Sequence, residues 1–313
     1  MLNLICIVDR EYSGEIANRL RGVGRYHPSR TVVCSVSDGR TDLDAVATIA
    51  APAEVAPGHF ASTRETVIVE VGPQHLAHLD TIVDPLVVTD LHTVVWSPHG
   101  HPEAVDALLR LAQIVLIDSG DDPEPADAVA RALELMPRAY IVDLSWLRST
   151  PWRERIAAAF DPPARRHDLR RIAEVTVRHH PDSVAAGLLL VGWLGSRLGW
   201  RCSPLVERGG GMVGSAAAPK QDVRIRLEPD REMSVRGLAG LTVAMSSGER
   251  LSLDRGSGGL QARREDRRGR VSTWTVVGAS RGEAGILGEG IRQALLRDAT
   301  YKPALESAKE LLA

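Results

Sequence analysis

The sequence predicts an α/β N-terminal domain with a mainly parallel sheet, followed by an α+β C-terminal domain with an antiparallel sheet. In the first half, apolar runs of strand length alternate with segments of helical periodicity, as βαβ units require. In the second half, runs that alternate apolar and polar residues follow one another across Gly- or Asp-rich turns. The length of 313 residues also suits two domains better than one core.

The expected strands of the first half are short and almost wholly apolar, which is typical of a sheet covered by helices on both faces. They are LNLICIV (2–8), RTVVCSV (30–36), ETVIVEV (65–71), HTVVWS (92–97), QIVLID (113–118) and AYIVDLSW (139–146). The helices expected between and after them cover 13–24, 74–83, 103–112, 125–136 and 151–160.

A linker is expected at DPPARRHD (161–168), because its prolines end the preceding helix. We therefore divide the chain into domains 1–163 and 164–313. The second domain begins with the strand IAEVTV (172–177) and a long apolar helix that ends near Gly199. Its remaining strands are DVRIRLEP (222–229), LTVAMSS (241–247), RLSLDR (250–255), LQARRE (260–265) and RVSTWTVV (270–277), and helices over 282–297 and 303–312 close the chain.

Composition narrows the possible functions. The net charge is −2, which argues against a nucleic-acid partner or an anionic membrane surface, because such binders carry a clear basic excess. No basic region precedes the first apolar run, and the apolar stretch 184–198 is shorter than a membrane span needs, so we expect a cytoplasmic protein. Three widely spaced cysteines predict no disulfide framework.

Two patterns resemble cofactor sites and are rejected. In RGGGMVGS, Gly209, Gly211 and Gly214 satisfy GxGxxG, but a proline and then a strand follow where a dinucleotide site needs a helix. We expect a flexible loop there and no nucleotide cofactor. The histidine pairs at 99/101 and 179/180 have no further ligand close in sequence, so we expect no metal.

Polar residues gather where three central strands are expected to end. Ligands of open α/β sheets bind at the carboxyl ends of the strands, so a small-molecule site could lie there. Its residues would be Trp96, Asp118, Ser119 and Asp143. The competing interpretation is that these side chains satisfy backbone donors and cap the following helices. No GxSxG elbow or Ser/His/Asp order is present, so no catalytic residues are assigned.

The stretch DLSWLRSTPWRERIAAAFD (143–161) holds two of the six tryptophans. Thr150 and Pro151 are a typical helix start. Trp152 shares an apolar stripe with later residues of that helix, which favours a core position. Trp146 follows the expected strand beside Arg148, and we expect it at a surface edge, where the two could stack.

Six segments together resemble the OpcA family, the glucose-6-phosphate dehydrogenase assembly proteins. They are YHPSRTVV (26–33), TVVWSPHG (93–100), LIDSGD (116–121), DLSWLRSTPWRERIAAAFD (143–161), AAGLLLVGWLGSRLGW (185–200) and LGEGIRQALLRDATYKPAL (287–305). Their order and spacing agree along nearly the whole chain, and DLSW-x-R-x-x-PWR is the most specific. The chain departs from the family after its central strand, where Trp96 is followed by serine rather than a second tryptophan.

The resemblance implies a non-catalytic cytoplasmic protein without a cofactor. It would bind glucose-6-phosphate dehydrogenase of the oxidative pentose phosphate pathway and promote its active oligomer. The residues expected at the partner surface are His27, Ser29, Arg30, Trp146, Arg148, Trp152 and Arg153. The alternative is a sugar-phosphate binding protein or enzyme with its site at the strand ends. A deep, polar, arginine-lined cavity there would favour the ligand, and a flat or filled edge with an exposed aromatic patch would favour the assembly protein.

Overall fold

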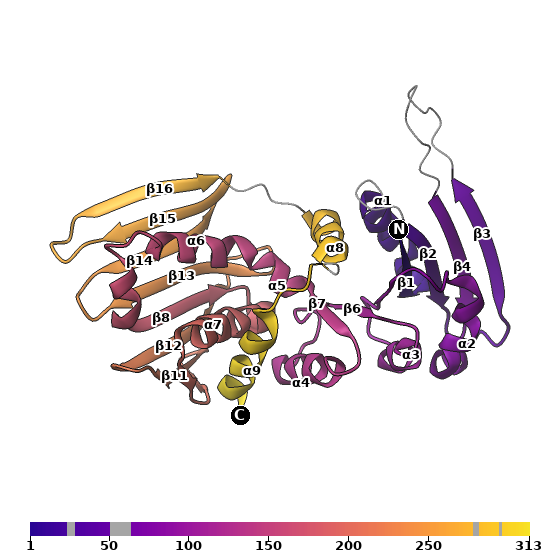
Figure 1. Ribbon diagram of the computed structural model, residues 1–313, viewed down its shortest axis with the longest axis horizontal. Helices are drawn as coiled ribbons and strands as arrows, with labels where there is room; N and C mark the ends of the chain where they lie inside the picture. Colours follow the sequence, from indigo (N-terminus) through magenta and orange to yellow (C-terminus); the bar gives the residue numbers. More distant parts are fainter. Residues whose placement is uncertain (24–28, 51–63, 278–281, 294–295) are drawn as a thin grey trace, which may run out of the picture. The chain divides into compact units, whose positions relative to one another are not determined.

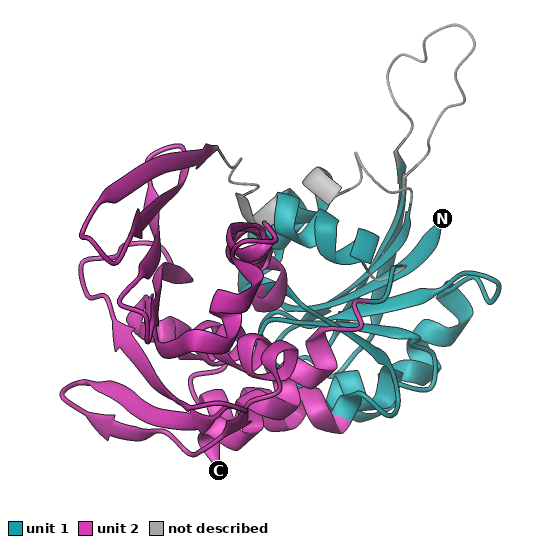
Figure 2. Cartoon of the chain, turned by 60° about the vertical axis from the view of Figure 1, so that its left-hand side comes forward, with its two compact units in different colours: residues 1–121, 135–144, 281–297 teal, residues 122–134, 145–280, 298–313 magenta. Residues whose placement is uncertain are grey.

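The computed structural model describes residues 1–23, 29–50, 64–277, 282–293 and 296–313 (Figure 1). The chain divides into two compact units (Figure 2). Unit 1 comprises residues 1–121, 135–144 and 281–297, and unit 2 comprises residues 122–134, 145–280 and 298–313. A single domain boundary after residue 163 stays a prediction.

Unit 1 contains a seven-stranded sheet in the order β3-β4-β2-β1-β5-β6-β7. Every neighbouring pair is parallel except β3 and β4, so the expected mainly parallel sheet is confirmed. The strands are β1 (Leu2–Asp9), β2 (Ser29–Val36), β3 (Asp44–Ala50), β4 (Arg64–Val71), β5 (Thr93–Trp96), β6 (Ile114–Ile117) and β7 (Tyr140–Asp143). The fully buried β1 and β5 lie at the centre, as apolar parallel strands require.

Short helices accompany the strands of unit 1. They are η1 (Arg10–Tyr12), α1 (Ser13–Val23), η2 (Pro73–His78), α2 (Leu79–Val83), η3 (Asp84–Leu86), α3 (Pro102–Leu108) and α8 (Gly282–Gln293). The helix α8 packs against α1, although the two are far apart in sequence. A segment that follows the last strand of unit 2 therefore contributes to the first unit.

Two features of the first half differ from the predicted set of strands. The strand β3 is not among the expected strands; its apolar Val46 and Ile49 are exposed, and it is held at the sheet edge by backbone pairing with β4. The strand expected at 139–146 ends at Asp143, and its last residues form α5 (Leu144–Arg148). These residues include no β-branched side chain and begin a run of helix that α6 (Thr150–Phe160) continues.

Unit 2 contains a nine-stranded sheet in the order β10-β11-β12-β8-β13-β14-β15-β16, with β9 paired to β11. Its strands are β8 (Ile172–His179), β9 (Arg201–Cys202), β10 (Val206–Arg208), β11 (Gly211–Ala217), β12 (Asp222–Pro229), β13 (Leu238–Met245), β14 (Arg250–Gly256), β15 (Gly259–Glu265) and β16 (Val271–Val277). The expected antiparallel sheet is in fact mixed, because β12 pairs parallel to β8. The connection between these two strands is long enough for a parallel crossover.

The remaining helices are α4 (Pro125–Leu135), η4 (Arg166–Arg171), η5 (Pro181–Ser183), α7 (Val184–Leu198) and α9 (Tyr301–Leu312). The apolar α7 covers β8 and β12 and packs closely on α9, where a Cβ on Gly192 would lie 2.2 Å from the Ala304 carbonyl oxygen. No helix in the described ranges has the length and apolar character to cross a membrane.

Candidate functional site

The carboxyl edge of the unit 1 sheet holds the residues expected to form a ligand site. Asp143 at the end of β7 accepts a hydrogen bond of 3.1 Å from the Ser119 amide, and Asp118 accepts one of 3.2 Å from the Gly120 amide. Trp96, Ser119 and Asp143 are each at most 3% exposed. The structure thus brings Asp118, Ser119 and Asp143 together as turn-forming groups within a filled edge, and a ligand role for them stays a prediction.

The switch point of the sheet lies between β1 and β5, where the strand order reverses and nucleotide-binding folds hold their ligand. Here Asp9 contacts His101 across 2.8 Å between the carboxylate and Nε2. The rings of Tyr12 and His99 lie 4.3 Å apart, and burial lowers the pKa of His99. Side chains of the protein itself occupy this position.

The turn after β1 differs from a dinucleotide cradle in its chemistry. It carries Asp9 and Glu11 around the 3₁₀ helix η1, and carboxylates at this place repel a pyrophosphate. The glycines 209, 211 and 214 lie elsewhere, in unit 2. Gly209 and Gly210 form a hairpin turn with φ of 64° and 79°, and Gly211 begins β11, so the expected flexible loop is in fact a β-hairpin.

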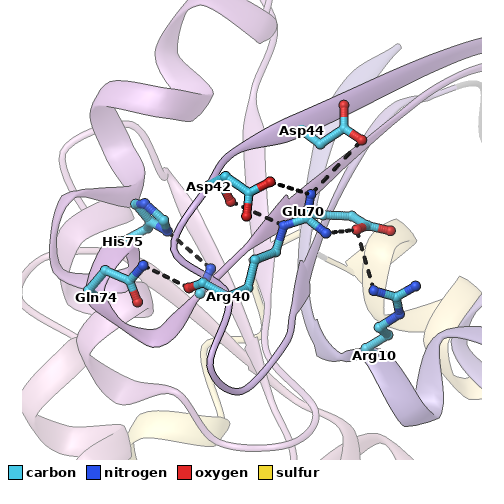
Figure 3. Close-up of polar contacts among 8 residues, drawn as sticks. Arg10, Arg40, Asp42, Asp44, Glu70, Gln74 and His75 are labelled. Atoms are coloured by element: carbon cyan, nitrogen blue, oxygen red, sulfur yellow. Dashed lines mark hydrogen bonds and ion pairs between the residues drawn. The ribbon is translucent and has the colours of Figure 1, made fainter.

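A network of polar side chains connects the segment after β2 with the end of β4 (Figure 3). The Arg40 guanidinium, after β2, donates to the Glu70 carboxylate and lies 3.5 Å from that of Asp42. The Arg40 carbonyl accepts a 2.7 Å hydrogen bond from the Gln74 amide, so the β2–β3 turn is fastened to η2. The Arg10 guanidinium, following β1, also lies 3.5 Å from Glu70. These charges compensate one another, which indicates a structural role.

In unit 2, Trp146 forms the centre of a buried cluster with charged partners. The Arg153 guanidinium lies 3.5 Å from the centroid of the Trp146 ring, and the indole Nε1 donates to Asp298 at 2.8 Å. The ring of Tyr301 lies 5.4 Å from the same indole. Trp146 is only 2% exposed, so the expectation of a surface position is wrong. A strand-end tryptophan was expected to project outward, but α5 turns it inward toward α9.

Arg153 is a connecting residue within the same cluster. It donates to the Trp146 carbonyl at 3.1 Å, to the Ser149 hydroxyl at 3.1 Å and to the Thr150 hydroxyl at 2.9 Å. Its Nη1 lies 3.7 Å from the Asp298 carboxylate. Arg153 therefore links the end of α5 to the start of α6, and like the tryptophan that it covers it is buried.

Burial and pairing act in opposite directions on the two charges. Burial lowers the pKa of Arg153 to about 10, although Asp298 favours the charged form. Burial also raises the pKa of Asp298, but hydrogen bonds from Thr300 and Trp146 and the nearby Arg153 outweigh this, so the pKa lies below its usual value. Both groups are ionised at neutral pH, and the pair is a partly buried salt bridge.

The other residues expected at a partner surface lie in different places. Trp152 is buried in the core, as its apolar stripe predicts, and Arg148 is half-buried. Ser29 and Arg30 lie at the amino end of β2, beside the start of β1, so they are at the opposite edge from Asp118 and Asp143. Arg30 forms an ion pair of 3.3 Å with Glu65. His27 lies outside the described residues.

Sequence reasoning missed Asp298 and Tyr301, which complete the Trp146 cluster. Asp298 is 152 positions from its indole partner, so no local pattern connects them. The sequence offered one indirect signal, which is that all four residues lie in segments that carry the family resemblance. Asp298 and Tyr301 belong to the segment 287–305, and Trp146 and Arg153 belong to the more specific segment 143–161.

Comparison with protein families gives two matches that follow one another along the chain. Residues 21–134 match the family described as the glucose-6-phosphate dehydrogenase subunit N-terminal domain, and residues 139–305 match the corresponding C-terminal domain. A protein of Synechococcus elongatus named for the OxPP cycle, OpcA, is 27% identical over 226 residues, which cover 71% of this chain and 49% of that protein. The Synechocystis OpcA is 32% identical over 130 residues, or 40% of this chain and 27% of that one. These alignments span half or less of the relatives' length.

Two solved structures with a similar fold are those of dehydrogenases. The apo scyllo-inositol dehydrogenase of Lactobacillus casei has a TM-score of 0.52 at 10% identity, covering 100% of this chain and 95% of that one. The WlbA dehydrogenase of Thermus thermophilus, solved with NAD and UDP-GlcNAcA, has a TM-score of 0.50 at 13% identity and coverage of 100% and 94%. At such identities the likeness shows a shared fold alone.

Proposed function

Because this chain belongs to the OpcA family of glucose-6-phosphate dehydrogenase assembly proteins, we propose that it binds glucose-6-phosphate dehydrogenase and promotes its active oligomer. The observation that carries this proposal is the pair of family matches, which run in order from residue 21 to residue 305. The relatives named for the OxPP cycle support a place in the oxidative pentose phosphate pathway.

The proposed action requires no catalysis by this chain. A protein that binds the active oligomer more tightly than the inactive form shifts the equilibrium toward the active one, by an amount equal to the difference in binding free energy. Two features support a non-catalytic role. The β1–α1 turn carries Asp9 and Glu11 instead of glycines, and the strand-end carboxylate of Asp143 is occupied by a backbone amide.

For the contact surface we propose the partly exposed candidates Ser29, Arg30 and Arg148. Arginine is enriched at protein interfaces and makes directional contacts with carboxylates. The buried candidates Trp146, Trp152 and Arg153 would contribute in a different way. They would hold the α5–α6 corner in shape, so that Arg148 on α5 is presented in a fixed position.

The test uses the dehydrogenase purified from the same organism. We expect a complex that sediments faster than either protein alone, together with a rise in dehydrogenase rate that saturates with added protein. Absence of both a complex and a rate change would refute the proposal.

The surface is tested separately by Arg30→Glu and Arg148→Glu, with Lys302→Glu on the exposed face of α9 as a control of equal charge change. We expect at least tenfold weaker binding for one of the first two and an unchanged affinity for the control. Each variant is first shown to unfold at the temperature of the parent protein. Equal affinities for all three would move the interface elsewhere without affecting the assembly proposal.

A further inference from the structure

A basic hollow lies in unit 2 at the start of the nine-stranded sheet, where η4 leads into β8. It has a volume of about 540 Å³. Its lining residues are Pro163, Arg166, His167, Arg170, Arg171, Lys220 and Gln221. We propose that this η4 pocket binds a small phosphate-bearing metabolite through its phosphate group.

Local structure explains why the cations converge. In a 3₁₀ helix, side chains three positions apart lie one above the other, which places His167 and Arg170 on the same face of η4. The Arg166 guanidinium is fixed by a hydrogen bond of 2.9 Å to the Asp161 carbonyl. Gln221 donates at 2.7 Å to the carbonyl of Ile172, and this bond holds the loop that carries Lys220 beside η4.

Three cations of the pocket have no acidic partner among the described residues. Within the described ranges, no carboxylate lies within 4.0 Å of a cationic nitrogen of Arg170, Arg171 or Lys220. Arginines elsewhere in the sheet, such as Arg178 and Arg224, do form such pairs.

The acidic group beside the pocket is already engaged. Asp168 lies 3.0 Å from the Nε2 of His167 and is itself buried. Burial first, and the charge of Arg165 second, lower the pKa of Arg264, while Glu249 and Asp168 act in the opposite direction. An anion in the pocket would give Arg170, Arg171 and Lys220 a partner of opposite charge.

The volume of the pocket and its charged donors indicate which class of ligand it binds. Its volume falls in the range of small-molecule sites, about 300–1,000 Å³. Guanidinium groups present paired donors that match two oxygens of one phosphate, and a dianion uses several cations at once. A nucleic acid would need a longer basic track, and the chain has a net charge of −2.

The experiment titrates the full chain with inorganic pyrophosphate by isothermal calorimetry at constant ionic strength. We expect saturable binding to one site, and at least tenfold weaker binding when Arg170→Gln and Arg171→Gln are combined. The matched control combines Arg267→Gln and Arg268→Gln, which removes the same charge from the exposed turn between β15 and β16. The control is expected to bind within twofold of the parent protein.

Three outcomes would overturn the proposal: binding that does not saturate, equal weakening in both double variants, or binding of hexaglutamate in preference to pyrophosphate. The last would identify the pocket as a docking site for an acidic peptide. All measurements use this protein alone, so their failure leaves the assembly proposal untouched, and failure of the assembly proposal leaves the pocket untouched.

Discussion

Replacing Asp298 with asparagine tests whether the partly buried ion pair stabilises unit 2. The substitution keeps one oxygen that can accept from the Trp146 indole. It removes the charge that lies 3.7 Å from Arg153, and it replaces the second oxygen, which accepts from the Thr300 amide at 2.8 Å and from the Thr300 hydroxyl at 2.6 Å. The Arg153 side chain is 10% exposed and that of Asp298 is 28% exposed, so solvent screens one partner in part.

The expected loss follows from these exposures. Removing one partner of a fully buried pair costs about 3–5 kcal/mol, whereas an exposed pair contributes about 0–1 kcal/mol. The partial exposure of Asp298 places this pair between the limits, and we expect Asp298→Asn to lower the free energy of unfolding by about 2 kcal/mol. Asp298→Ala also removes the acceptor for the indole, and should cost about 1 kcal/mol more.

The assay is urea unfolding at pH 7, followed by tryptophan fluorescence. A double-mutant cycle with Arg153→Gln isolates the pairwise energy, for which we expect a coupling of about 1.5 kcal/mol. The control is Asp182→Asn, which removes the ion pair with Arg236 at 3.6 Å on an exposed surface and should cost less than about 0.5 kcal/mol. A loss for Asp298→Asn no larger than that of this control would refute the reasoning.

The pH dependence gives the same prediction a second check. The folded protein lowers the pKa of Asp298, so its contribution is fully present above the unfolded value of about 3.9 and disappears as pH falls through the folded value. The stabilities of the parent protein and Asp298→Asn should therefore converge below pH 4. A difference that stays constant as the pH falls below 4 would mean that shape rather than charge causes the loss.

Three further substitutions test the packing and the buried histidine. Gly72→Ala would place a Cβ 1.7 Å from the Arg40 carbonyl oxygen, so we expect a loss of more than about 2 kcal/mol in urea unfolding. Gly192→Ala meets the Ala304 carbonyl at 2.2 Å and should lower the melting temperature by separating α7 from α9. Burial lowers the pKa of His179, so the parent protein should lose stability as pH falls below about 6.5, and His179→Asn should flatten that dependence between pH 7.5 and 5.5.

The central strands of unit 1 could be predicted from sequence because their residues are buried on both faces, which leaves a continuous apolar run. The edge strand β3 could not, since its backbone pairs with β4 while Val46 and Ile49 face solvent. The parallel pairing of β8 with β12 was equally hidden. Each strand shows the alternation of a one-sided sheet, and alternation carries no information about the direction of a neighbour that is distant in sequence.

In the candidate site, too, contacts between residues distant in sequence could not be predicted. Periodicity placed Trp152 correctly in the core, because its partners lie on the same helix. The burial of Trp146 depends on Asp298 and Tyr301, which approach it only through the tertiary fold. A tryptophan close to an arginine in sequence is compatible both with a surface position and with a buried cluster. The sequence alone therefore did not show that Trp146 is buried.

The most specific residues of the family resemblance therefore form an internal cluster, and this changes where a partner surface should be sought. Side chains that are bonded to one another within this cluster, such as Trp146, Arg153 and Asp298, maintain the fold of unit 2 and cannot by themselves distinguish one partner from another. Recognition has to come from groups at the surface that a partner can contact. At the carboxyl edge of unit 1, the pairs Arg40–Glu70 and Asp9–His101 already satisfy such groups internally.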